Sequence, residues 1–91
     1  MIYTVYILFS QEYKKIYIGF TSNLIQRFYS RNIYGKGWTM KFRPWVIIYA
    51  EYYESKTMAM TREKQLKQAK GREWIWSKIN CQFSIQGFIS V

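Results

Sequence analysis

The sequence contains no histidine and no aspartate, and its 91 residues include a single cysteine and a single proline. The absence of histidine removes the usual general base and every Ser-His or Cys-His catalytic pair. Cys81 cannot form an internal disulfide, and without His or Asp it lacks the partners for a zinc site. Chemistry on this chain is therefore limited to tyrosine, lysine, arginine and five glutamates.

The sequence also lacks an apolar run long enough for a membrane span, and its start lacks the basic-then-apolar order of a signal peptide. The expected location is therefore the cytoplasm. The length predicts one domain, and a hydrophobic content of 49% predicts that it folds around a core. We expect this domain to cover residues 1–79. The uncharged residues 80–91 are expected to add a strand, pack as a tail or stay loose.

Negative charge is scarce, and this scarcity indicates the kind of partner. Fourteen Lys and Arg residues against five Glu residues give a formal net charge of +9. So large an excess on a small domain favours a polyanion: DNA, RNA or an anionic membrane surface.

The first twenty residues predict a β-hairpin. The segments Tyr3–Phe9 and Ile16–Phe20 are rich in aromatic and β-branched residues, and a polar segment of hairpin-loop length separates them. A fold about the middle of Gln11–Glu12 places Tyr6 opposite Tyr17, with both phenols on one face of the sheet. The two rings are then either a packing pair or a pair that carries chemistry.

A helix and a further strand are predicted next. An apolar stripe predicts a helix over Leu24–Arg31, capped within Thr21–Asn23 and ended by Gly35–Gly37. A basic loop then leads to Pro44. The β-type run Trp45–Tyr53 is expected to form the central or the third strand.

Two more helices are predicted in the remainder. Ser55 or Thr57 can cap a helix running to about Ala69, with Gly71 in a left-handed C-terminal cap. A short third helix is expected over Arg72–Ile79. The predicted fold is a small α/β domain with a three-stranded, largely antiparallel sheet flanked by helices, in the order β-β-α-β-α-α.

Two charged side chains have a structural and a functional interpretation. Glu63 shares a helix face with Ala59 and Leu66, so we expect it to point inward. A carboxylate there needs a partner, either an arginine in a salt bridge or a divalent metal ion. Arg27 is either a solvated helix-face residue or a phosphate ligand, since guanidinium binds phosphate in a bidentate manner.

Several motifs in order resemble those of the GIY-YIG nuclease superfamily. The resemblance covers about Tyr3 to Lys78, and the chain looks like the small stand-alone members (UPF0213-like) and like the N-terminal nuclease module of excinuclease ABC. The motifs that carry it are Val5-Tyr6-Ile7, Tyr17-Ile18-Gly19, Thr21-Ser22 with Arg27, Arg43-Pro44-Trp45, and Arg62-Glu63-Lys64-Gln65-Leu66-Lys67 continuing into Lys70-Gly71-Arg72-Glu73.

The resemblance implies a metal-dependent endonuclease that hydrolyses DNA phosphodiester bonds, in DNA repair or processing, with no small-molecule cofactor. It implies catalytic roles for Tyr6, Tyr17, Arg27 and Glu63, with Glu63 holding one Mg²⁺ or Mn²⁺. Nucleic-acid contacts are expected at Gly19, Arg31, Lys64, Lys67, Lys70 and Arg72.

The chain departs from the family pattern at three positions. Val5 stands where the family has glycine, Phe20 where excision-repair members have lysine, and Arg31 where histidine is common. Asn80 is a candidate for the family's late asparagine. An alternative interpretation is a non-catalytic nucleic-acid-binding module on the same scaffold. A protein-interaction domain would leave the basic excess unexplained.

Overall fold

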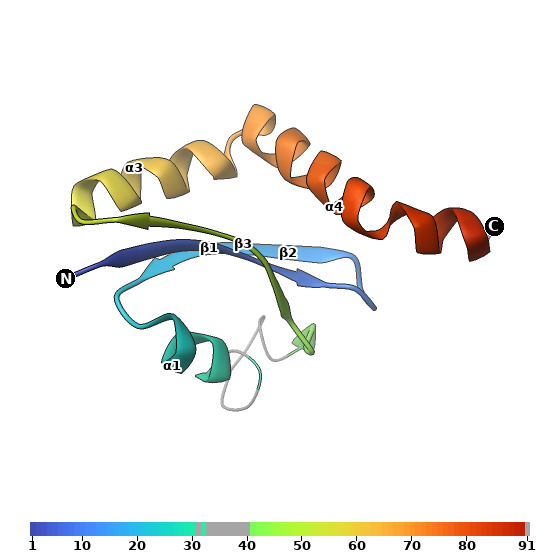
Figure 1. Cartoon of the computed structure of the whole chain (residues 1–91), viewed down its shortest axis with the longest axis horizontal. Coiled ribbons are helices and arrows are strands. Elements are labelled where there is room, and N and C mark those ends of the chain that lie inside the picture. The colour runs from blue at the N-terminus through green and yellow to red at the C-terminus, as the bar shows by residue number, and fades with distance from the viewer. Residues whose placement is uncertain (31, 33–40, 91) are drawn as a thin grey trace.

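The computed structural model describes residues 1–30, 32 and 41–90. Its elements are β1 (Tyr3–Ser10), β2 (Lys15–Thr21), α1 (Leu24–Tyr29), β3 (Val46–Tyr53), α3 (Lys56–Lys67) and α4 (Ala69–Ser90). The strands form one antiparallel sheet in the order β2-β1-β3. Helices α3 and α4 lie on one face of the sheet and α1 lies on the other (Figure 1). The predicted α/β class, antiparallel sheet and element order are confirmed.

The central strand β1 is buried on both faces, from Thr4 to Ser10. Its alternate side chains enter two separate cores. On the side of α3 and α4, the buried members are Val5, Ile7, Phe9, Ile16, Ile18, Ala59, Leu66, Ile75 and Ile79. On the side of α1, they are Tyr6, Leu8 and Trp45. Tyr6 therefore belongs to the core that α1 covers.

The register of the hairpin differs from the predicted one. Tyr6 lies opposite Gly19, and Leu8 lies opposite Tyr17. The expected pairing of Tyr6 with Tyr17 is wrong because the turn lies further along the chain, with Lys14 at a positive φ of 57°. The offset is two residues along β2, so both tyrosines still point to the same face, whereas an offset of one would have separated them.

The third strand lies at an edge of the sheet. Strand β3 pairs with β1 alone, with a register shift between Ile7 and Leu8. The expectation that Trp45–Tyr53 is the third strand is confirmed, and the alternative of a central position is wrong. The strand order leaves β2 at the opposite edge.

The first two predicted helices begin at predicted caps. Asn23 Oδ1 accepts a hydrogen bond from the backbone N–H of Gln26 at the start of α1. Ser55 Oγ accepts one from Met58 at the start of α3. The predicted stop at Gly35–Gly37 lies outside the described residues.

Helix α4 corrects three expectations. Helix α3 ends at Lys67 with Gln68 as its cap, so Gly71 is not a left-handed cap but a residue of the first turn of α4. The helix begins at Ala69 instead of Arg72 and continues to Ser90, so the segment after residue 79 is helical. The strand and loose-chain alternatives for this segment are wrong, and its packing as a tail stays a prediction. The division between a domain over residues 1–79 and a functionally separate tail stays a prediction.

Glycine at position 71 is required by close packing of the two helices. A Cβ atom there would lie 2.4 Å from the Gln65 carbonyl oxygen and 2.6 Å from Leu66 Cα. The missing side chain lets the start of α4 rest directly on the last turn of α3. Within the described part of the chain, no helix is long and apolar enough to cross a membrane.

Candidate active site

Tyr6 and Tyr17 stack against each other on the α1 face of the sheet. Their ring centroids are 6.3 Å apart and their planes meet at 26°. Tyr6 comes from the central strand and is 1% exposed, whereas Tyr17 comes from the edge strand β2 and is half-buried. Trp45 packs edge-on against Tyr17, with 6.4 Å between the ring centroids. The predicted shared face is confirmed, and Tyr17 is the member of the pair that reaches the sheet edge.

Gly19 provides the space that the Tyr6 phenol occupies. A Cβ atom at Gly19 would lie 2.7 Å from the phenol oxygen of Tyr6 and 3.2 Å from Cε1 of Tyr17. A separation below 3.0 Å forces one of the atoms to move. Gly19 is itself buried, so the group that closely approaches it is Tyr6. Direct contact between Gly19 and nucleic acid stays a prediction.

Arg27 projects from the last turn of α1. The helix packs onto the core of Tyr6, Leu8 and Trp45, here called the tyrosine core. It does so through the partly buried Leu24 and Phe28, which places Arg27 beside that core. Arg27 is exposed and lines an open hollow of about 750 Å³. The other residues around this hollow are Thr21, Ser22, Asn23, Gln26, Tyr29 and Ser30. Arg31, the other predicted cation of this helix, lies outside the described residues.

Asn32 connects the region after α1 to the start of β3. Its Oδ1 accepts a hydrogen bond of 2.7 Å from the Trp45 backbone N–H, and its Nδ2 donates one of 3.2 Å to the Trp45 carbonyl. Arg43 donates to the Asn32 carbonyl oxygen. Asn32 thereby positions the indole that packs against Tyr17. Sequence periodicity carries no signal for this contact, because the partners are 13 residues apart.

Glu63 points inward from α3, as predicted. Its helix neighbours Ala59 and Leu66 are buried, and its own side chain is 19% exposed. Its Oε1 lies 3.7 Å from Lys67 Nζ, a distance too long for a direct hydrogen bond. The ion pair uses the lysine one turn along the helix instead of an arginine, and Lys67 is 53% exposed. Such pairs contribute about 0–1 kcal/mol, so Glu63 can exchange this partner at little cost.

Tyr17 connects the tyrosine core to the basic residues of α3 and α4. A hollow of about 340 Å³ at the β2 edge is lined by Ile16, Tyr17, Ile18, Lys67 and Arg72. The predicted cations Lys64, Lys67, Lys70 and Arg72 are all exposed and cluster where α3 meets α4. The structure therefore places positive charge beside the half-buried Tyr17.

The four predicted catalytic residues do not all lie on one face of the sheet. Arg27 is on the α1 side, and Glu63 is on the side of α3 and α4 (Figure 1). Tyr17 lies at the edge between them, in contact with Tyr6 on one side and beside Lys67 on the other. The β2 edge, where Tyr17 and Lys67 line one hollow, is a route by which a ligand can reach both charged residues.

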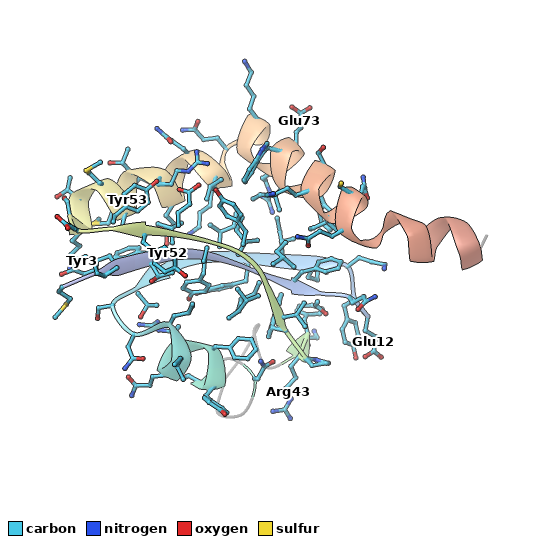
Figure 2. The ribbon with its side chains drawn as sticks, viewed as in Figure 1. Tyr3, Glu12, Arg43, Tyr52, Tyr53 and Glu73 are labelled. Carbon is cyan, nitrogen blue, oxygen red and sulfur yellow. The ribbon has the colours of Figure 1, made fainter. Side chains whose placement is uncertain are left out.

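Sequence reasoning missed a carboxylate that the structure surrounds with donors. Arg62 holds Glu51 in a bidentate pair, with Nε 2.9 Å from Oε1 and Nη2 3.0 Å from Oε2. The phenols of Tyr49 and Tyr53 donate to the same carboxylate. Figure 2 shows Tyr53 between β3 and α3. This network fastens α3 to β3 along the edge opposite to β2.

A sequence signal for this network exists. Tyr49, Glu51 and Tyr53 alternate along β3, so all three point to the face that α3 covers. A carboxylate under a helix needs a cation, and Arg62 precedes Glu63 on that helix. Glu51 therefore needs a partner for the same physical reason as Glu63.

The Glu51 carboxyl titrates below its usual range. Burial by itself raises its pKa, but the hydrogen bonds from Arg62, Tyr49 and Tyr53 and the charge of Arg62 outweigh burial and lower the pKa. Tyr49 and Tyr53 show the reciprocal effect, because donation to Glu51 raises the pKa of each phenol. Since the folded-state pKa of Glu51 is lower than the unfolded one, its stabilisation is complete above the unfolded pKa. It is lost as the pH falls through the folded pKa.

We expect Glu51→Gln to lower the free energy of unfolding by about 2 kcal/mol at neutral pH, the size of a lost charge-assisted hydrogen bond. The difference from the wild type should shrink as the pH falls through the lowered pKa of Glu51, because protonation removes the same charge. Urea unfolding at neutral and acidic pH measures both effects. Glu54→Gln, at an exposed glutamate, is the matched control and should change little. An equal loss for Glu51→Gln at both pH values would contradict this account.

Fold and motif together define a nuclease-type catalytic domain. The family model of the GIY-YIG catalytic domain matches residues 2–80, and the chain belongs to this family. It is similar to the solution NMR structure of the UPF0213 protein BH0048 from Bacillus halodurans, with a TM-score of 0.52 and 25% identity. The match covers 85% of this chain and 84% of that one. No curated protein matches the chain.

Nucleases of this family generally depend on a divalent metal. Among the described residues, no three carboxylates or other ligating side chains gather into a metal cage. Mg²⁺ nevertheless prefers one or two carboxylates together with water and substrate phosphates. The half-buried Glu63, with its long and exchangeable ion pair, fits that requirement as a single protein ligand.

Proposed function

We propose that this protein is a divalent-metal-dependent endonuclease that hydrolyses DNA phosphodiester bonds, in DNA repair or processing, in the cytoplasm. The observation that supports this most directly is the stacked Tyr6–Tyr17 pair, whose outer ring lies at the sheet edge beside Lys67 and Arg72. A DNA backbone approaching this edge meets two cations and a phenol in one hollow. The net charge of +9 favours that approach.

Tyr6 acts on the attacking water in this proposal. As general base, or as the relay to one, it takes the proton while the water oxygen attacks phosphorus in line with the leaving oxygen. An ordinary phenol has a pKa of about 10 and is a base only when neighbouring positive charge favours its ionised form. In this proposal that charge comes from Arg27, which lies on the helix that covers the core containing Tyr6.

The other residues hold the phosphate as its charge grows. Tyr17 forms a hydrogen bond with the phosphate or with the attacking water, and Arg27 stabilises the developing negative charge through its guanidinium. Glu63 would hold Mg²⁺ or Mn²⁺, which when bound would stabilise the negative charge on the leaving oxygen. The neighbouring phosphates, which carry no sequence information, are contacted by Lys64, Lys67, Lys70 and Arg72, with Gly19 and Arg31 as the remaining expected contacts.

The alternative is a nucleic-acid-binding module without catalysis. One observation favours it: Arg27 and Glu63 lie on opposite faces of the sheet, so no single face presents both residues to one phosphate (Figure 1). In this alternative the cations still contact phosphates, and Glu63 serves only as the ion-pair partner of Lys67.

Incubation with supercoiled plasmid and with branched DNA, in Mg²⁺, Mn²⁺ or EDTA, distinguishes the two functions. We expect divalent-dependent nicking that EDTA abolishes. Binding in EDTA should weaken steeply with salt, and each phosphate contact removed by Lys→Ala should lower the log–log slope by about 0.9 on duplex DNA. Salt-sensitive binding without cleavage on any substrate would favour the binding module. Affinity that does not respond to salt would count against both.

A further inference from the structure

A second hollow lies where α3 meets α4, and the proposed active site does not use it. It measures about 330 Å³, near the lower end of the roughly 300–1,000 Å³ of small-ligand pockets. Its polar and aromatic lining consists of Arg62, Gln65, Gln68, Lys70 and Trp74. The close contact at Gly71 sets its shape, because it brings the first turns of α4 against the end of α3.

Trp74 is the aromatic wall of this hollow. Its ring packs edge-on against Tyr49, with centroids 5.0 Å apart at 83°, so the sheet holds it in place. The indole nevertheless stays 38% exposed. Lys78 Nζ lies 5.4 Å from its ring centre and the Arg62 guanidinium carbon 5.7 Å from it. A fixed, partly exposed indole among cations is the arrangement by which proteins hold bases of single-stranded nucleic acid.

The polar residues around Trp74 have different tasks. Arg62 is already committed to Glu51 through two hydrogen bonds, so it is a rigid wall whose charge is largely neutralised. Lys70 is exposed and lines the hollow, which leaves it to contact a phosphate. The Gln65 and Gln68 amides supply donors and acceptors suited to a base edge.

Glu73, the acidic residue next to Trp74 in the sequence, does not repel an anionic ligand in this hollow. Glu73 is exposed and points away from the sheet at the start of α4 (Figure 2). On the other side of the helix junction, Lys67 and Arg72 line the hollow that contains Tyr17. Exposed cations therefore link the two hollows.

We infer that the hollow at the α3–α4 junction binds an unpaired base of single-stranded DNA. The base stacks on Trp74, and the phosphate beside it contacts Lys70. The strand then follows the exposed cations of the junction toward Tyr17 at the β2 edge. This inference rests on the DNA-binding part of the proposed function and not on cleavage. It assigns the protein a DNA ligand with a single-stranded segment that extends from the helix junction to the β2 edge.

The test compares two oligonucleotides with equal numbers of phosphates: a short oligothymidylate and an abasic strand of the same length. Fluorescence anisotropy in EDTA measures both affinities without cleavage. The wild type should bind oligothymidylate more tightly. Trp74→Ala should reduce that affinity by on the order of tenfold, the size of one lost base–aromatic stack, and leave the abasic strand unaffected. Lys70→Ala should weaken both strands alike and lower the salt slope by about 0.7.

Two further variants separate stacking from folding. Trp74→Leu keeps an apolar side chain against Tyr49 but has no ring, so it should lose the preference for oligothymidylate. Its melting temperature should be equal to that of Trp74→Ala or higher. Trp74→Phe should retain most of the preference. Equal wild-type affinity for both strands, or an unchanged preference in the folded Trp74→Leu protein, would overturn the inference and leave the nuclease proposal standing. A preference that disappears with the ring, in a protein that never cuts DNA, would support the inference and count against the nuclease.

Discussion

Tyr6→Phe should lower the rate of single-turnover DNA cleavage by about 10²–10⁴-fold, the usual size of a general-base contribution. The substitution removes one oxygen and keeps the ring that stacks 6.3 Å from Tyr17 and fills the space above Gly19. Packing in the α1-side core therefore stays almost complete. A large loss of rate with an unchanged fold would assign the chemistry to the hydroxyl.

Tyr17→Phe is the matched control for this experiment. It removes the same group from the half-buried partner, whose proposed task is a hydrogen bond to the phosphate. That loss should cost about 1–3 kcal/mol of barrier, less than the loss of the base. Melting temperature and DNA affinity, measured for both variants, should stay close to those of the wild type. Wild-type cleavage by Tyr6→Phe would overturn the proposed mechanism.

Glu63→Gln should abolish divalent-dependent cleavage and leave DNA binding nearly intact. The amide keeps the size of the side chain but loses the charge that holds Mg²⁺ or Mn²⁺. Metal-ion stabilisation is worth several kcal/mol and each 1.36 kcal/mol is tenfold in rate, so we expect a loss of at least about 10³-fold. Cleavage rate, oligonucleotide affinity and melting temperature are measured on one preparation.

Lys67→Gln separates the metal from the ion pair. It removes the partner 3.7 Å from Glu63 but keeps the carboxylate, so divalent-dependent cleavage should persist while DNA binding weakens by one phosphate contact. If Glu63 serves only that ion pair, Glu63→Gln and Lys67→Gln should both lower the melting temperature slightly and spare cleavage. That pattern would leave the chain with the binding-module function.

Local patterns in the sequence were sufficient for most of the fold. The alternation of residues in the first hairpin put Tyr6 and Tyr17 on one face even though the predicted register was two residues off. Caps at Asn23 and Ser55 marked two helix starts correctly, because a cap depends only on the next three residues. The predicted register of the hairpin was wrong because register depends on the conformation of a single turn residue, Lys14.

Helix ends were harder to predict where the neighbouring helix decides them. Gly71 has the sequence signature of a cap, but the structure uses it for contact with Gln65 and Leu66. The residues after 79 carry no charge and no clear apolar period, so nothing local indicated that α4 continues to Ser90. A helix already nucleated extends by one hydrogen bond per residue, which an isolated pattern cannot reveal.

The sequence by itself determined the charge, the element order and the residues of the family motifs, because each depends on residue identity and short-range spacing. Only the tertiary structure decided which of those residues meet. It divided Arg27 and Glu63 between two faces, made Tyr17 the connection between them, and brought Glu51 to Arg62 and Trp74 to Tyr49. These contacts depend on which helix covers which face of the sheet, and burial of the two cores as a whole determines that arrangement.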